Sequence, residues 1–150
     1  MARALHLAAE NARNGNGGPF AAIVARGEET ISEGTNLVTS SNDPTAHAEI
    51  VAIRLACASL QTFQLAGCEL YTSCEPCPMC LGAIYWARPS LIYYCGTHKD
   101  AANAGFDDTF IYQQTRLPVR ERSIPMLRVL PDQANVPFDA WRMNLNRIQY

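Results

Sequence analysis

Two cysteines and a histidine have the spacing of metal ligands. A helix beginning near Pro78 would place the sulfur atoms of Cys77 and Cys80 on one face, about one turn apart. The N-terminus of a helix also stabilises thiolates, the form of cysteine that binds metal. His47, near the start of another expected helix, adds an imidazole. We therefore expect one Zn²⁺ held by His47, Cys77 and Cys80, since two sulfurs and one nitrogen favour zinc.

Three protein ligands leave one position of a four-coordinate zinc open to water, which is typical of catalytic sites. Cys74 offers an alternative, because a fourth ligand would turn the site into a closed structural one. Cys74 and Cys77 also have the spacing of a redox pair. The open catalytic site is the interpretation that the spacing favours.

Glu49 lies two residues after His47 and is the expected proton carrier. Zinc lowers the pKa of its bound water to about 7, and a nearby carboxylate can take up the released proton and pass it on. On a regular helix, residues two apart point about 200° apart. Glu49 must therefore reach round the first turn, or the helix must begin late. The alternative is a solvated glutamate favoured by the helix dipole.

The elements that must position these residues alternate between helix and strand, which predicts a layered α/β fold in one domain, residues 1–150. Asp43 and Pro44 mark a helix start, because aspartate caps helices well and proline fits the first helical position. The opening hairpin makes the sheet mixed. Periodicity and turn residues predict helices at 3–13, 43–60, 78–88, 107–113 and 137–148, and strands at 19–25, 30–38, 69–72, 91–95 and 126–130.

Charge and composition exclude some classes of function. The net charge of −2 and the pI near 5.9 argue against a strong grip on nucleic acid. No apolar run approaches the ~18 residues of a membrane span, and the first residues lack a secretory pattern, so we expect a cytoplasmic protein. Charged residues make up 17%, against about 25% in ordinary domains. That low share fits either an oligomer interface or a slightly apolar monomer.

The residues His47-Ala48-Glu49 and Pro76-Cys77-Pro78-Met79-Cys80 together match the two-part signature of zinc-dependent nucleobase deaminases. The chain is thus similar to the cytidine-deaminase-like superfamily. From about residue 17 to the C-terminus it resembles the bacterial guanine deaminases. The segments that carry this resemblance are Gly17–Phe20, Ser41–Glu49, Tyr71–Pro89, Gly105–Asp108 and the terminal Tyr150.

The resemblance implies a three-layer α/β/α sandwich around a five-stranded mixed sheet. It also implies a pocket for a small purine base, with His47, Cys77 and Cys80 as zinc ligands and Glu49 as proton shuttle. The further substrate-binding residues that it implies are Asn36 and Phe20 on the base, Asp108 on the guanine edge, Tyr150 closing the pocket and Trp86 lining it.

These roles agree with the chemistry of guanine. Its N1–H and exocyclic amine are donors, and a carboxylate such as Asp108 can accept from both. The amide of Asn36 can both donate and accept. Without the resemblance, simpler interpretations compete: Asp108 as a helix cap, Asn36 as a turn residue, Phe20 as core and Tyr150 as a frayed terminus.

The reaction that the resemblance implies is hydrolytic deamination of guanine to xanthine and ammonia. Hydroxide on zinc would attack C2, and Glu49, with Asp108 as a second catalytic residue, would move the protons. The family resemblance further implies a homodimer with one zinc per subunit. Its C-terminal segment would be exchanged across a hinge within residues 97–125, so that Asp108 or Tyr150 enters the partner's pocket.

Other functions share parts of this pattern. A guanosine deaminase, or another amino-purine or triazine deaminase, would use the same zinc core. Cytosine and tRNA-adenosine deaminases would as well, although the acidic pI counts against a tRNA substrate. A zinc-stabilised binding module without turnover is a further alternative, and Glu49 beside an open metal site argues against it.

Overall fold

The computed structural model describes residues 1–150 and centres on a four-stranded sheet with the order β2-β1-β3-β4. Strand β1 is antiparallel to both of its neighbours, whereas β3 and β4 run parallel, so the sheet is mixed as expected. The strands are β1 (Ala21–Arg26), β2 (Glu29–Thr35), β3 (Glu69–Cys74) and β4 (Leu91–Gly96).

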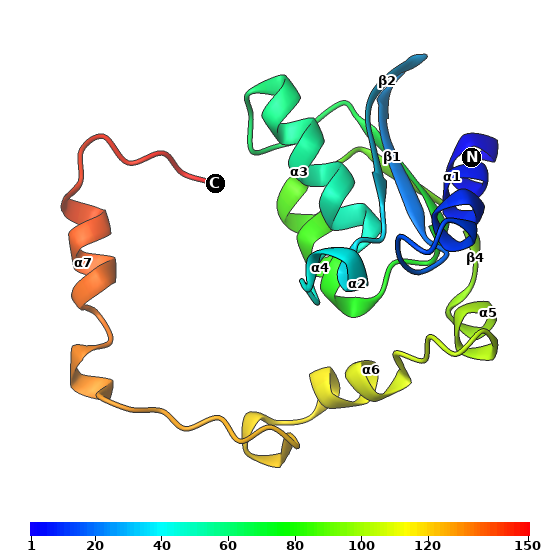
Figure 1. The fold of residues 1–150 in the computed structure, drawn as a ribbon. Coiled ribbons are helices and arrows are strands. Elements are labelled where there is room, and N and C mark those ends of the chain that lie inside the picture. Colours follow the sequence, from blue (N-terminus) through cyan, green and yellow to red (C-terminus); the bar gives the residue numbers. More distant parts are fainter. The chain divides into compact units, whose positions relative to one another are not determined.

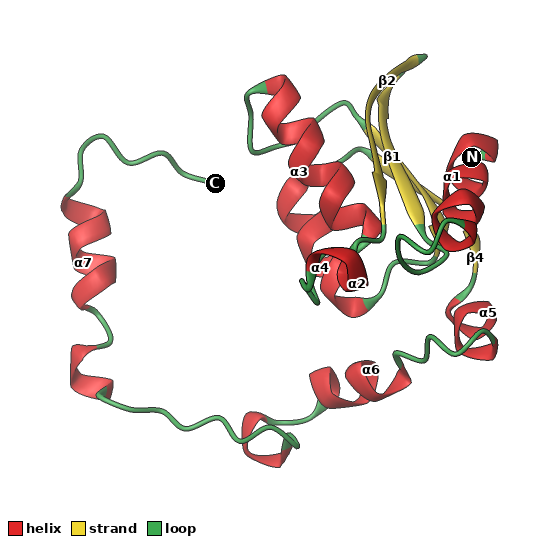
Figure 2. Cartoon of the chain, in the orientation of Figure 1, coloured by secondary structure: helices red, strands yellow, loops and turns green.

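Helices cover both faces of this sheet (Figures 1 and 2). Helix α1 (Ala2–Arg13) lies on one face, and α3 (Ala48–Leu60) with α4 (Pro78–Ala87) on the other. The structure therefore has the layered α/β architecture that the alternating elements predict. The remaining helices are α2 (Val38–Ser41), α5 (His98–Asn103), α6 (Thr109–Arg116) and α7 (Val136–Met143), with 3₁₀ turns at Val119–Glu121 and Pro131–Gln133.

The segments that carry the predicted site residues meet at one edge of the sheet. Strands β2, β3 and β4 run in the same direction, so their carboxyl ends share this edge. Strand β1 runs the opposite way and begins there. The residues that follow or precede these strand ends are therefore neighbours in space, although they are far apart in the sequence.

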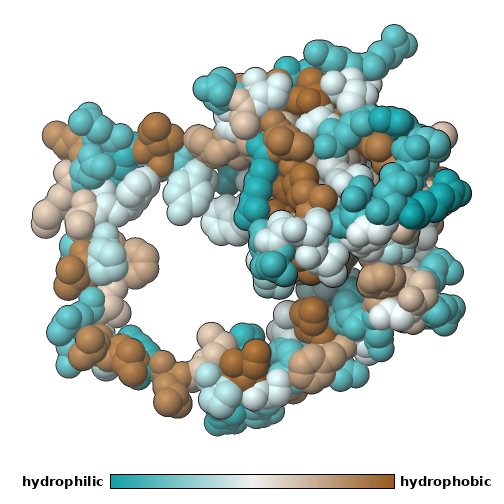
Figure 3. Space-filling view, in the orientation of Figure 1, coloured by the Kyte–Doolittle hydropathy of each residue, from teal (hydrophilic) through white to brown (hydrophobic).

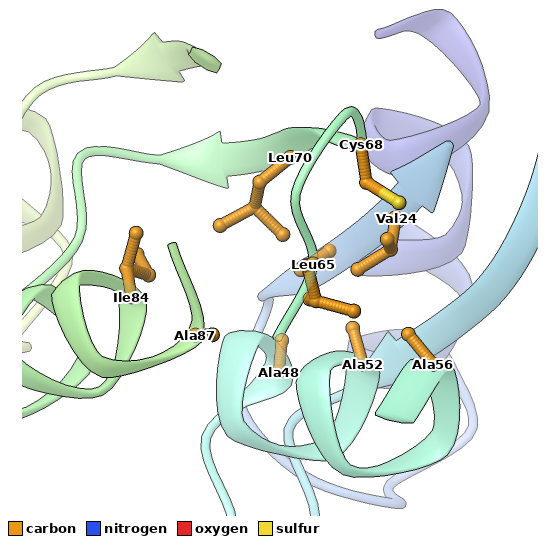
Figure 4. Close-up of a cluster of buried hydrophobic side chains, with 10 residues drawn as sticks. Val24, Ala48, Ala52, Ala56, Leu65, Cys68, Leu70, Ile84 and Ala87 are labelled. Atoms are coloured by element: carbon orange, nitrogen blue, oxygen red, sulfur yellow. The ribbon is translucent and has the colours of Figure 1, made fainter. Parts of the chain in front are cut away.

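The core lies between the sheet and helix α3, and small residues allow a close approach. Ala48, Ala52 and Ala56 form a fully buried face of α3, and they pack with Val24 and Leu70 of the sheet (Figure 4). On β2, a Cβ at Gly34 would lie 2.5 Å from the carbonyl oxygen of Ala48 and from the amide nitrogen of Ala52. Helix α3 thus rests directly on the backbone of β2.

The predicted fifth strand is wrong: residues 126–130 have no strand structure, and the sheet has four strands rather than five. A strand needs a neighbouring backbone to pair with, and this segment has no such partner in the chain. Other boundaries also shift. Helix α3 begins at Ala48 rather than near Asp43, α7 ends at Met143, and α2 and α5 lie where no helix was predicted.

Asp43 explains the late start of α3. Its side chain accepts hydrogen bonds from the backbone amide and the hydroxyl of Thr45, at 2.8 and 2.7 Å. The aspartate therefore shapes a turn before the helix instead of capping its first turn.

The chain forms two compact units, Met1–Ile111 and Tyr112–Tyr150, with the boundary inside α6. No residue of the second unit is buried. Both apolar and polar side chains lie on its surface (Figure 3). Leu127, Met143 and Leu145 are more than three-quarters exposed. No helix in the chain is both long enough and apolar enough to cross a membrane.

Replacing Gly34 by alanine is expected to destabilise the protein and displace α3. The added methyl group would meet backbone atoms that cannot rotate away, so we expect a loss of about 2–3 kcal/mol in the free energy of unfolding, as in other overpacked cores. Urea unfolding of the zinc-loaded protein measures this change.

Gly82→Ala is the matched control. Gly82 lies in α4 with open space around it, and alanine favours a helix by about 1 kcal/mol over glycine. Equal unfolding free energies for the two variants would contradict the close packing of α3 on β2.

Candidate active site

The first turns of α3 and α4 bring the predicted metal ligands together. His47 and Cys77 are the residues immediately before these helices, and both have extended backbones. Neither side chain caps its own helix. The two side chains instead face one another, with Cys77 Sγ 3.6 Å from His47 Nδ1. Cys80, one turn into α4, places its Sγ 3.5 Å from the same nitrogen.

These distances fit a tetrahedral zinc ion. Zinc bonds of about 2.3 Å to sulfur and 2.05 Å to nitrogen would separate the two donor atoms by roughly 3.6 Å. The three donor atoms also lie within 4.8 Å of one another, and this group does not include Cys74. The Cys74 thiol instead donates to the carbonyl oxygen of Thr97 at 3.4 Å. His47, Cys77 and Cys80 thus form a three-donor group that could hold a zinc ion, and a tetrahedral ion there would keep a fourth position for water.

Charges within this cluster are coupled. A hydrogen bond from Cys80 lowers the pKa of Cys77 to about 4, although burial opposes the shift, and a bond with His47 adds to it. The same bond to Cys77, together with burial, raises the pKa of Cys80. The hydrogen bond with Cys77 also raises the pKa of His47. One thiolate is therefore stabilised before any metal arrives, and metal binding would displace the remaining protons.

Glu49 lies in the first turn of α3, and its side chain is buried, with 6% exposed. Because the helix begins late, this residue reaches the same cavity as His47 and Cys77. Burial raises the pKa of Glu49, since desolvation disfavours the carboxylate. A buried carboxyl group beside a metal site is suited to accepting and returning a proton.

A cavity of about 370 Å³ opens beside the metal-ligand cluster. Of the predicted substrate-binding residues, Phe20, Asn36 and Asp108 line it. Trp86 does not: it lies on α4, and 63% of it is exposed. Tyr150 belongs to the second unit of the chain, with 71% exposed. The first unit thus brings together seven of the nine predicted site residues.

Asn36 follows β2 and is held firmly. Its Oδ1 accepts from the backbone amides of Gly18 at 3.4 Å and Val38 at 3.2 Å. Its backbone carbonyl accepts from the side chain of Asn11 at 2.9 Å, and a Cβ at Gly17 would clash with that carbonyl at 2.1 Å. With Oδ1 engaged by the backbone, the Nδ2 group is the donor that this amide can offer to a ligand.

Phe20 and Asp108 also line the cavity. The Phe20 ring packs edge-on against Phe106, with 5.0 Å between ring centroids. Asp107, not Asp108, accepts the hydrogen bond from the Thr109 amide that shapes the turn before α6. The carboxylate of Asp108 is therefore not used in that turn. Burial raises its pKa, and the charge of Cys77 adds to the effect.

Glu75 and His98 also line the cavity, although neither had a predicted role from the sequence. Glu75 Oε2 accepts from the backbone amide of His98 at 3.2 Å and pairs with its Nδ1 at 3.0 Å. These bonds lower the pKa of Glu75. The predicted order of strands could have indicated this pair, because segments that follow adjacent parallel strands meet at the same edge of a sheet.

Comparison with known proteins agrees with this geometry. The profile of the cytidine and deoxycytidylate deaminase zinc-binding region matches residues 1–96. Guanine deaminase from Bacillus subtilis is 54% identical over 150 residues, which is all of this chain and 96% of the relative. The chain belongs to the guanine deaminase branch of the zinc-dependent deaminases.

Solved structures support the same placement within this branch. The crystal structure of Bacillus subtilis guanine deaminase has a TM-score of 0.96 at 55% identity, covering 99% of this chain and 94% of that one. Guanine deaminase from Nitrosomonas europaea has a TM-score of 0.68 at 38% identity, covering 72% of this chain and 63% of that one.

A relative that matches a shorter part of the chain is a tRNA-specific adenosine deaminase from Aquifex aeolicus, which is 43% identical over 81 residues, or 54% of each chain.

The ligand set of this deaminase can be tested by metal content. Cys77→Ser is expected to reduce bound zinc to well below one ion per chain, because it removes one of three donors. Cys74→Ser is the matched control and should keep about one ion per chain, since Cys74 lies outside the donor group. Zinc is measured by elemental analysis after dialysis. Loss of zinc from the Cys74 variant would instead indicate a closed, four-ligand site.

Proposed function

We propose that this protein hydrolyses guanine to xanthine and ammonia in the cavity beside His47, Cys77 and Cys80. The observation that carries this function is that one cavity joins a three-donor group able to hold a metal, the buried Glu49, and the side chains of Phe20, Asn36 and Asp108. The full-length likeness to Bacillus subtilis guanine deaminase supports guanine as the substrate.

The cavity wall suits the edges of guanine. The Nδ2 group of Asn36 can donate to a ring nitrogen or to the carbonyl oxygen, since its Oδ1 already accepts two backbone bonds. The Asp108 carboxylate can accept from N1–H and from the amine. Phe20, braced by Phe106, offers an aromatic surface for the flat base. Cytosine lacks the paired donors that Asp108 would bind.

Glu49 transfers the protons in this deamination. When bound, zinc supplies a Lewis acid that brings the pKa of a water near 7. Glu49 accepts a proton from the attacking water and delivers it to N3 while the oxygen bonds to C2. It then transfers the second water proton to the exocyclic nitrogen, the C2–N bond breaks, and ammonia leaves. Asp108 lies in the same cavity and can assist at the amine.

We further propose a homodimer in which the segment Tyr112–Tyr150 is exchanged between subunits. This segment buries none of its residues and exposes many apolar side chains, so it gains little from the hydrophobic effect by itself. Covering it with a second copy would bury that surface. Tyr150 would then close the partner's pocket, and Trp86, exposed on α4, would contribute to the pocket only in that assembly.

A cytoplasmic location fits this activity. None of the six cysteines forms a disulfide, which agrees with a reducing compartment. The net charge of −2 fits a small-molecule substrate better than a nucleic acid. We therefore propose a purine base as the substrate, with neither nucleic acid nor membrane as a partner.

Glu49→Ala is expected to lower the rate of ammonia release from guanine at least 10³-fold, because the proton carrier is lost. Zinc should stay at about one ion per chain, since Glu49 is not a ligand. The exposed Glu28→Ala is the control and should leave both quantities unchanged. A Glu49 variant that retains zinc and full activity would indicate a binding module.

The substrate itself is tested with zinc-loaded protein and a panel of guanine, guanosine, ammeline, adenine and cytosine. We expect ammonia from guanine well above all the others. Release from another compound instead would keep the chemistry of Glu49 but overturn the proposed base contacts. Release from none of them would contradict the proposed function and direct attention to tRNA.

Exchange of the C-terminal segment predicts complementation between inactive Glu49→Ala and a chain that lacks Tyr150, whose own activity should be weakened. Refolded together, they should recover about a quarter of the full activity, because half of random dimers are mixed and one pocket in each mixed dimer is complete. Activity assays with light scattering measure this. No recovery in a dimeric mixture would mean that Tyr150 serves its own subunit or none.

A further inference from the structure

We propose that Glu75 is a positioning residue that holds Asp108 against the base through His98 and helix α5. This inference rests on the proposed function, since it assigns Asp108 to guanine. It adds a residue with no role in the metal site or in proton transfer. The connection runs from the carboxyl end of β3, through one carboxylate, to the loop that carries Asp108.

The first link is the contact between Glu75 and His98. The backbone amide of Glu75 donates to the carbonyl of Gly96 at 2.8 Å, which fixes the residue where β3 and β4 end. Its Oε2 receives two bonds from His98, one from the backbone amide at 3.2 Å and one from Nδ1 at 3.0 Å. A single carboxylate oxygen thus holds both the main chain and the side chain of the first residue of α5.

The second link is the short path from α5 to Asp108. Helix α5 has only six residues, and the chain leaves it through Gly105, whose φ is +93°. The amides of Gly105 and Phe106 donate back to the carbonyls of Ala102 and Ala101, at 3.0 and 2.9 Å. The residues just before Asp108 are therefore tied to the last turn of α5, and a displacement of that helix would be passed on to Asp108.

None of the residues of α5 is buried, so the helix has no side chain anchored in the core. Other contacts to α5 or its exit loop include the Cys74 thiol to the Thr97 carbonyl at 3.4 Å and the edge-on packing of Phe106 against Phe20. A thiol is a weak donor. The two bonds from His98, by contrast, reach a charged carboxylate and are the stronger kind of hydrogen bond.

The position of Glu75 in the sequence suggests what the bond between Glu75 and His98 does for the site. Glu75 stands two residues before Cys77, so the segment that carries a metal ligand also carries the carboxylate that anchors the Asp108 loop. The reacting carbon beside the metal and the guanine edge bound by Asp108 would then both be positioned by one short segment after β3. Displacing a substrate-positioning group by about 1 Å can cost about 10²-fold in rate.

The experiment is a double-mutant cycle with Glu75→Ala and Asp108→Asn in zinc-loaded protein. Glu75→Ala should lower kcat/KM for guanine about 10- to 100-fold, with about one zinc per chain retained. In the Asp108→Asn background, the same change should have little further effect, because the group that it positions is already impaired. Glu75→Gln, which keeps an oxygen acceptor of the same reach, should recover most of the activity.

A second readout does not depend on activity. Hydrogen exchange of the backbone amides of residues 105–108 should rise in Glu75→Ala, because their anchor is lost. Glu33→Ala is the matched control: it removes a two-bond ion pair with Arg3 elsewhere on the protein and should change neither exchange in this loop nor kinetics.

The outcomes separate this proposal from the proposed function. Unaltered protein that releases no ammonia from guanine would overturn the proposed function, while exchange would still report on the anchor. With an active enzyme, fully additive effects of the two substitutions would overturn the positioning role. Loss of zinc from Glu75→Ala would do so too, because Glu75 would then act through the metal ligands. Unchanged exchange at residues 105–108 would overturn the anchor itself.

Discussion

The contact of α3 with the bare backbone of β2 at Gly34 is the constraint on which the site depends. It brings the small buried face of α3 against the sheet and so sets where the helix begins. His47 precedes that first turn and Glu49 lies within it. Because α4 packs beside α3, its own first turn delivers Cys77 and Cys80 to the same place. A bulkier contact on β2 would move two of these four groups away from the others.

The N-termini of α3 and α4 meet at the site, and together they favour the negative charges that metal binding and proton transfer require. Each helix dipole stabilises negative charge near its start, and here that charge belongs to thiolates and to a carboxylate. Burial acts in the opposite direction on Glu49 and raises its pKa. The helix dipoles and burial therefore act in opposite directions at Glu49, and a raised pKa suits a carboxyl group that must both take up and release protons.

Strand direction explains the rest of the cavity. Asn36 follows β2, Glu75 follows β3, His98 follows β4, and Phe20 precedes β1, so one sheet edge gathers all four. The second unit of the chain differs in kind, since it has no buried residue and no strand. Its apolar side chains have no cover within that unit, which is the physical basis for proposing a second copy of the chain.

The sequence by itself determined the local chemistry. The spacing of Cys77 and Cys80, the histidine and the neighbouring glutamate predicted the metal site, and periodicity predicted the four strands and the main helices. Those signals are local, because they depend on residues within a few turns of one another. The tertiary structure decided what depends on distant segments. It made α3 begin at Ala48, so that Glu49 shares the cavity of His47, and it joined Glu75 to His98. It left residues 126–130 without a strand, because strand formation requires a paired backbone and residue patterns alone do not supply that partner.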